Sequence, residues 1–153
     1  MNIVEFLKEQ KVPFEARHHP PRFTAQEVAA VEHVSGEAVA KVVVVKADDR
    51  FVMCVLPATY VLIMDRLKEI RHAKSARLAT EEEMAGLFPD TEIGAEPPFG
   101  LEYGLDIVAE MHLAEDDKIL IPAGTHHDSV LLKWSDFERV AHPVLASIGV
   151  HTT

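Results

Sequence analysis

A lysine inside an apolar segment is the first residue of this sequence that could take part in chemistry. Lys41 stands between an apolar pair and the four consecutive valines of Val42–Val45. In a strand, alternation would place Lys41 on the face of Val43 and Val45, whereas Lys46 would point the other way. Apolar neighbours force such an ammonium group to reach water, to pair, or to accept a lowered pKa. Two interpretations follow: a lysine that extends to solvent, or a cation at a pocket mouth that binds a phosphate, a carboxylate or a developing oxyanion.

A second feature is the segment Gly94-Ala95-Glu96-Pro97-Pro98-Phe99-Gly100, in which two glycines bracket two prolines. Proline fixes the backbone, and glycine permits a positive φ or a close approach. Such a loop can present backbone N–H groups at fixed positions, which is the geometry that an oxyanion site needs. The alternative is a plain connecting turn.

The histidines form two adjacent pairs, His18-His19 and His126-His127, and the second pair is followed by Asp128. Adjacent residues of a strand point to opposite faces, so only one member of each pair can enter a given pocket. A zinc site needs three or four converging ligands, and neither H-E-x-x-H nor C-x-x-C occurs in the sequence. The pairs therefore favour roles at a pocket rim or in proton relay over metal binding.

The sequence offers no evident covalent nucleophile. It contains no G-x-S-x-G elbow, no P-loop and no G-x-G-x-x-G motif. The single cysteine, Cys54, cannot form an internal disulfide, and its apolar surroundings at 51–56 predict an inert core thiol.

Helix and strand patterns mix without strict alternation, which predicts a single mixed α+β domain over residues 1–153. Capping signals mark helix starts at Asn2, Thr24, Thr80 and Ser135, the last three as boxes with Glu27, Glu83 and Glu138. Apolar spacing predicts a further helix over 60–72. Strands are predicted over 14–17, 39–46, 51–56, 76–79, 106–111, 118–121 and 129–133, with a hairpin turn at 46–50.

Composition narrows the function classes. The formal net charge of −10 argues against indiscriminate nucleic-acid binding. One basic cluster is either a solvated helix face or a phosphate-steering surface; it consists of Arg66, Lys68, Arg71, Lys74 and Arg77. No apolar run approaches the ~18 residues of a membrane span. The start of the chain is unlike a signal peptide, so we expect a cytoplasmic protein.

In this order, the segments resemble the YbaK and prolyl-tRNA-synthetase-associated editing domains. The lysine-bearing strand and the G-x-x-x-P loop with its trailing Phe-Gly are the main points of similarity. The other matching segments are 6–7, 12–14, 24–29, 123–127 and 135–137.

The resemblance implies a YbaK-like α/β fold, with a central, largely antiparallel mixed sheet and flanking helices. It also implies a trans-editing enzyme that hydrolyses the ester between a wrongly attached amino acid and the 3′-terminal adenosine of tRNA. Known members remove alanine or cysteine from proline tRNA. No metal or organic cofactor is expected. The partner would be the acceptor end of an aminoacyl-tRNA, and a synthetase is a further candidate.

On the matching positions, the resemblance gives each candidate residue a role. Lys41 would anchor the terminal nucleotide or the substrate carbonyl, and backbone donors near Gly94 would face the developing oxyanion. Pro98 and Gly100 belong to the same loop and are expected to contact substrate. An aminoacyl ester is already activated, so water or the vicinal ribose hydroxyl can attack without a protein nucleophile.

Further positions concern the amino-acid pocket and departures from the family pattern. His127 or His19 would line that pocket or hold water. Val42 stands where several members have Thr or Asn, which removes a polar group. Glu96 adds a negative charge to the loop; it could bind a substrate α-ammonium, but we expect it to face solvent.

Two other functions compete with this one. The absence of an indispensable acid–base pair is compatible with a non-catalytic module that binds a tRNA end or an aminoacyl analogue. A more distant alternative is a small-molecule ester or amide hydrolase that uses His126, His127 and Asp128.

Overall fold

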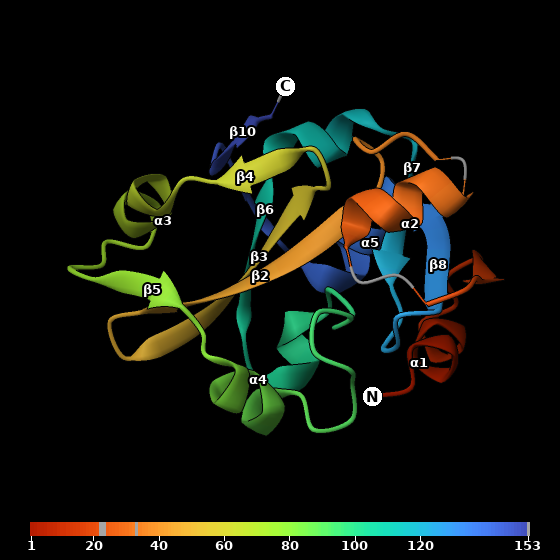
Figure 1. The fold of residues 1–153 in the computed structure, drawn as a ribbon, viewed down its shortest axis with the longest axis horizontal. Coiled ribbons are helices and arrows are strands. Elements are labelled where there is room, and N and C mark those ends of the chain that lie inside the picture. The colour runs from red at the N-terminus through yellow and green to blue at the C-terminus, as the bar shows by residue number, and fades with distance from the viewer. Residues whose placement is uncertain (22–23, 33, 153) are drawn as a thin grey trace.

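The computed structural model describes residues 1–21, 24–32 and 34–152. Within these ranges a five-stranded mixed sheet lies beside a three-stranded sheet and a two-stranded ribbon (Figure 1). The large sheet has the order β5-β2-β3-β6-β9; its strands are β2 (Ala40–Ala47), β3 (Arg50–Pro57), β5 (Ala76–Leu78), β6 (Asp106–Glu110) and β9 (Val144–Ala146). Two of its pairings are antiparallel, β2 with β3 and β5, and two are parallel, β6 with β3 and β9. The mixed α/β fold predicted from the sequence is therefore confirmed.

The hairpin of β2 and β3 forms the centre of the molecule, and its turn falls within the predicted segment. Ala47 pairs with Arg50, and Asp48 in the turn has φ 52°, a left-handed conformation that Asp tolerates better than most residues. Alternate residues of β3 enter two different cores, with Met53 in one and Cys54 in the other. Both faces of β3 are covered, which explains why its sequence is apolar almost throughout.

The three-stranded sheet has the order β1-β8-β7, with β1 (Phe14–His18), β7 (Lys118–Pro122) and β8 (Asp128–Lys133). It meets the large sheet where Val39 forms a parallel bridge with Leu120, just before β2 begins. In Figure 1 the helix α2 (Ala25–Glu32) lies beside this junction. The junction therefore brings together segments that are far apart in the sequence.

The remaining helices lie around the sheets (Figure 1). They are α1 (Ile3–Glu9), α3 (Met64–Ile70), α4 (Glu81–Leu87) and α5 (Trp134–Ala141), with 3₁₀ turns at Gly100–Tyr103 and Met111–Glu115. Asn2 caps α1 through its side chain, and Thr80 and Glu83 form the full predicted capping box of α4. Thr24 also accepts from the Glu27 backbone, as predicted for the start of α2.

Three sequence predictions about elements are wrong. The segment expected to begin a helix at Tyr60 is instead β4 (Tyr60–Leu62), which pairs with β10 (Gly149–His151) before α3 starts. Ser135 is not the cap of α5, because that helix begins one residue earlier and its cap residue, Lys133, makes no side-chain cap bond. The apolar residues Val140 and Val144 after the Ser135 box predict that this helix continues past Ala141, but it ends there and Val144 lies in β9.

No helix within the described ranges is long and apolar enough to cross a bilayer.

Candidate functional site

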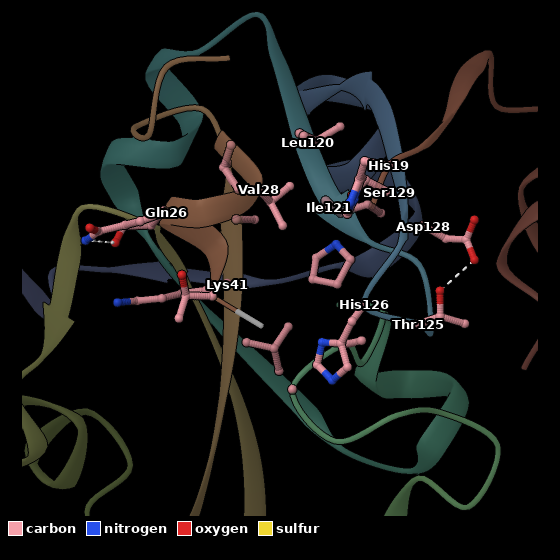
Figure 2. A pocket seen from close by; sticks show the side chains of 18 residues that line it. His19, Gln26, Val28, Lys41, Leu120, Ile121, Thr125, His126, Asp128 and Ser129 are labelled. Atoms are coloured by element: carbon pink, nitrogen blue, oxygen red, sulfur yellow. Dashed lines mark hydrogen bonds between the residues drawn. The ribbon is translucent and has the colours of Figure 1, made fainter. Parts of the chain in front are cut away.

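A cavity of about 530 Å³ opens where the two larger sheets meet. Its size lies within the range of small-molecule sites, which is roughly 300–1,000 Å³. The walls come from α2, the start of β2, the end of β7, the turn between β7 and β8, and the segment at 94–95. The polar residues that line it come from several of these elements: His19, Gln26, Lys41, Thr125, His126, Asp128 and Ser129 (Figure 2).

Lys41 lies on the cavity wall at the start of β2. Its side chain points toward the end where Gln26 lies, away from His126 (Figure 2). Burial lowers the pKa of this half-buried ammonium group. Within the described part of the chain, the Lys41 ammonium group has no ion-pair partner, whereas the Gln26 side chain donates to the carbonyl of Ala58 at 3.1 Å. A partly desolvated cation without an anion beside it is suited to bind one from outside.

In the loop that begins at Gly94, the side chain of Glu96 folds back onto the backbone amide of Gly94. The Gly94 N–H donates to both carboxylate oxygens of Glu96 at 2.9 Å. Glu96 is only 1% exposed, so the expectation that it faces solvent is wrong. The next amide, that of Ala95, donates to the carbonyl of Glu92. The amides predicted to face an oxyanion are therefore occupied within the loop.

Glycine is favoured at position 94 by its backbone conformation, since its φ is 92°. The loop lies against His126 here, because a Cβ at this position would be in ordinary contact with that ring, at 3.4 Å. The His126 backbone N–H is anchored to Glu92 at 2.6 Å, which holds the turn against the loop. Burial raises the pKa of Glu96, and the hydrogen bond from Gly94 only partly opposes this shift.

The end of the cavity opposite Lys41 is formed by β8 and the turn before it (Figure 2). Asp128 accepts from the Thr125 hydroxyl at 2.6 Å and is 2.8 Å from Nδ1 of His18. Ser129 is 3.0 Å from Nε2 of His19, and both side chains are at most 5% exposed. This end is therefore rich in hydrogen-bond acceptors.

Sequence comparison places these features in a family. The profile described as "Aminoacyl-tRNA editing domain" matches residues 19–140, most of the chain. This chain belongs to the aminoacyl-tRNA editing domain family. The resemblance inferred from the lysine-bearing strand and the glycine–proline loop is thus confirmed.

Individual relatives agree with the family assignment. Proline--tRNA ligase of Bacillus subtilis (strain 168) is 31% identical over 125 residues, which is 78% of this chain and 21% of the ligase. The chain thus spans about a fifth of that relative's length. Two solved structures share the fold: hypothetical protein APE2540 (TM-score 0.89, 20% identity, covering 98% of this chain and 100% of that one) and a proposed trans-editing enzyme for prolyl-tRNA synthetase (TM-score 0.86, 16% identity, covering 97% and 95%).

The cavity of this editing domain brings together three of the six residues selected from the sequence. Lys41, Gly94 and His19 line it. Pro98 and Gly100 are buried and do not line it, and His127 lies in the turn without lining it. Gly100 is closely packed, since a Cβ there would come within 3.0 Å of Ile107. The functional roles of all six remain predictions.

Other residues line the cavity that were not among the six selected from the sequence, chiefly His126 and Ser129. The alternation rule indicated that one member of His126-His127 would enter a pocket, but did not say which one. The two lie in a turn, where side-chain direction follows the local backbone and not alternation. His126, His127 and Asp128 do not all enter the cavity, which weakens the three-residue hydrolase interpretation.

Two further sequence features have structural roles. Cys54 is fully buried, and burial raises the pKa of its thiol to about 12, which fits an inert core residue. The basic cluster is partly neutralised by its neighbours, because Arg71 pairs with Asp106 at 2.8 Å and Arg77 pairs with Glu83 at 2.7 Å.

Proposed function

We propose that this editing domain is a trans-acting aminoacyl-tRNA deacylase that hydrolyses the ester of a tRNA mischarged with a small amino acid, such as alanine or cysteine on proline tRNA. The observation that carries the proposal is the charge distribution of the cavity. Lys41, a cation with no ion-pair partner among the described residues, lies at one end, and the carboxylate of Asp128 lies at the other. The end of an aminoacyl-tRNA has the complementary pattern, with anionic phosphate on the nucleotide and a cationic α-ammonium on the amino acid.

The chemistry asked of the protein is modest, because the ester is already activated. The cavity would hold the ester so that water or the vicinal ribose hydroxyl attacks its carbonyl carbon, and positioning supplies much of the acceleration. Lys41 would bind the terminal nucleotide or the carbonyl oxygen. The Gly94 amide could serve the oxyanion only if Glu96 released it. The raised pKa of Glu96 favours that release, since a protonated carboxyl group accepts more weakly.

The test is a deacylation panel with the purified protein and alanine, cysteine, serine and threonine esters of tRNA, including alanyl- and cysteinyl-tRNA for proline. We expect hydrolysis above the buffer rate for at least one small amino acid. Lys41→Ala should lower that rate about 100-fold, as expected for loss of a charge-stabilising donor. Lys46→Ala is the matched control, because its ammonium group lies 5.6 Å from the centre of the Phe51 ring and is not part of the cavity wall. No turnover of any ester would refute the proposal.

The occupied Gly94 amide favours one alternative, a non-catalytic module that binds the acceptor end of tRNA. Such a module would bind deacylated tRNA with a steep salt dependence and leave every ester in the panel intact. Turnover that depends on Lys41 excludes it.

A further inference from the structure

One buried pair in the cavity has no part in the mechanism above. Ser129, on β8, is 4% exposed, and His19, just after β1, is 5% exposed. Nε2 of His19 lies 3.0 Å from the Ser129 hydroxyl oxygen, and Nδ1 lies 2.9 Å from the carbonyl oxygen of Pro20. Both side chains line the cavity, side by side in Figure 2.

The direction of the hydrogen bonds follows from the carbonyl group at one end. A carbonyl oxygen can only accept, so Nδ1 of His19 carries the proton and donates to Pro20. In the neutral imidazole, Nε2 is then an acceptor, and the Ser129 hydroxyl donates its only proton to it. The remaining lone pairs of the Ser129 oxygen can only accept. The pair therefore presents the cavity with a fixed hydrogen-bond acceptor.

The surroundings of Ser129 favour a cationic donor. Asp128, the preceding residue, places a carboxylate at the same end of the cavity, although its side chain points away from Ser129 and toward Thr125 (Figure 2). Burial alone would raise the pKa of Asp128, but hydrogen bonds from Thr125 and His18 outweigh that effect and lower it. The carboxylate is therefore ionised at neutral pH. Lys41 extends at the opposite end, so the two charges do not neutralise each other directly (Figure 2).

We propose that the Ser129 hydroxyl accepts a hydrogen bond from the α-ammonium group of the aminoacyl ester, and that His19 is the positioning residue that keeps this hydroxyl an acceptor. This inference rests on the proposed function, since it assigns the amino-acid end of the same cavity. It predicts that the site selects aminoacyl groups over acyl groups of the same shape that lack the amine. It also fixes the orientation of the substrate, with its phosphate at Lys41 and its amine at Ser129.

The test uses two stable analogues that differ only in the amine. In both, an amide replaces the ester at the 3′ position of adenosine 5′-monophosphate; one carries an alanyl group and the other a propionyl group. We expect the wild-type protein to bind the alanyl analogue at least about tenfold more tightly by calorimetry, as for a hydrogen bond to a charged group. Ser129→Ala should reduce this preference about tenfold by weakening alanyl binding, with propionyl binding unchanged.

Two other variants separate positioning from a merely structural role. His19→Phe keeps Ser129 but frees its hydroxyl to rotate, so the preference for the alanyl analogue should also fall. Ser135→Ala removes an exposed hydroxyl on α5 and should change neither affinity. Thermal unfolding of each variant checks that it folds. A full preference retained in Ser129→Ala would overturn the inference.

The outcomes for the wild-type protein distinguish the two proposals. Equal binding of both analogues overturns the role of Ser129 and leaves the deacylase function standing. Binding of neither analogue, together with an inactive deacylation panel, overturns the proposed function and this inference with it.

Discussion

The pKa values of two buried glutamates in this molecule are shifted in opposite directions. Glu96, in the loop beside the cavity, is 1% exposed, and Glu110, at the end of β6, is 0% exposed. Glu96 accepts from the backbone of Gly94 with both oxygens. Glu110 accepts from the backbone amides of Ile148 and Gly149 with one oxygen, and from the backbone and the ring of His112 with the other.

The number of donors decides the outcome. Burial tends to raise the pKa of both groups, and for Glu96 it prevails. For Glu110 the hydrogen bonds from His112, Gly149 and Ile148 together outweigh burial and lower the pKa. The negative charge of Glu110 stabilises the fold, because it holds the backbone amides at the start of β10 by hydrogen bonds. A negative charge on Glu96 instead lowers the stability of the fold. Charges held at a cost are typical of functional sites, which supports placing function at the cavity.

Replacement of Glu110 should have the largest effect on stability. In Glu110→Gln the side-chain nitrogen can only donate, so it opposes the donors of His112 or those of Ile148 and Gly149. We expect the free energy of unfolding to fall by about 3 kcal/mol, the usual cost of breaking a buried charged network. Urea denaturation at pH 7 measures it.

Glu102→Gln is the control for that measurement, because it removes an exposed carboxylate and should leave stability within about 0.5 kcal/mol of the wild type. A loss below about 1 kcal/mol in Glu110→Gln would show that the hydrogen bonds around Glu110 do not fasten the C-terminal strand as described.

Much of the fold could be predicted from local patterns. The valine-rich strand, the apolar strand after it and the capping box at Thr80 all follow rules that act within a few residues. The strand at Tyr60–Leu62 could not be found in this way. It is only three residues long, it continues an apolar spacing that suits a helix, and its partner strand begins at Gly149. Pairing over such a distance is a tertiary effect that leaves no local signal.

In the candidate site, too, some features follow from the local sequence and others depend on the tertiary structure. Lys41 was identifiable because a cation in an apolar strand conflicts with its surroundings. The burial of Glu96 was not, since it depends on the loop folding back so that the side chain meets the amide two residues earlier. The pairing of Ser129 with His19 joins residues 110 positions apart and required the sheet of β1 and β8.

Replacement of Glu96 should change the free energy of unfolding less than replacement of Glu110 does, and the change should depend on pH in the opposite direction. In Glu96→Gln an oxygen still accepts from Gly94, so we expect a change in stability below about 1 kcal/mol at pH 7. Because the folded-state pKa of Glu96 is raised, the wild type loses stability as the pH rises from its ordinary value near 4.3 through the folded pKa. Glu96→Gln lacks this loss.

For Glu110 the sign is reversed, because its lowered pKa gives stability that is present above about pH 4.3 and lost as the pH falls through the folded value. Urea unfolding of wild type, Glu96→Gln and Glu110→Gln from pH 3 to about 7 therefore compares the two glutamates directly. Parallel pH profiles for the two variants would contradict the contrast between them.

The histidine beside Glu110 should contribute less, since its ring is partly exposed. The hydrogen bond from His112 to Glu110 raises the histidine pKa. Stability from the protonated ring is therefore full below about pH 6.5 and is lost as the pH rises through the folded pKa. The advantage of the wild type over His112→Gln should shrink in that interval. Repeating the comparison in the Glu110→Gln background should remove most of this pH dependence, because Glu110 makes the largest contribution and the charges of Glu115 and Glu37 make smaller ones. An unchanged pH dependence there would contradict the role of Glu110.

The smallest change in stability is expected for replacement of Lys41. This replacement should stabilise the protein, whereas replacement of Glu110 should destabilise it. Burial lowers the pKa of this ammonium group, so folding disfavours its charge at neutral pH, and Lys41→Met should stabilise the protein by a few tenths of a kcal/mol. Lys46→Met, on the same strand, should give no such gain, because that ammonium lies over the Phe51 ring. Urea denaturation and the deacylation assay are run on the same preparations. A variant that is slightly more stable but inactive would show that the cation is retained for its substrate, whereas a destabilised variant would place Lys41 among the residues that hold the fold, as Glu110 does.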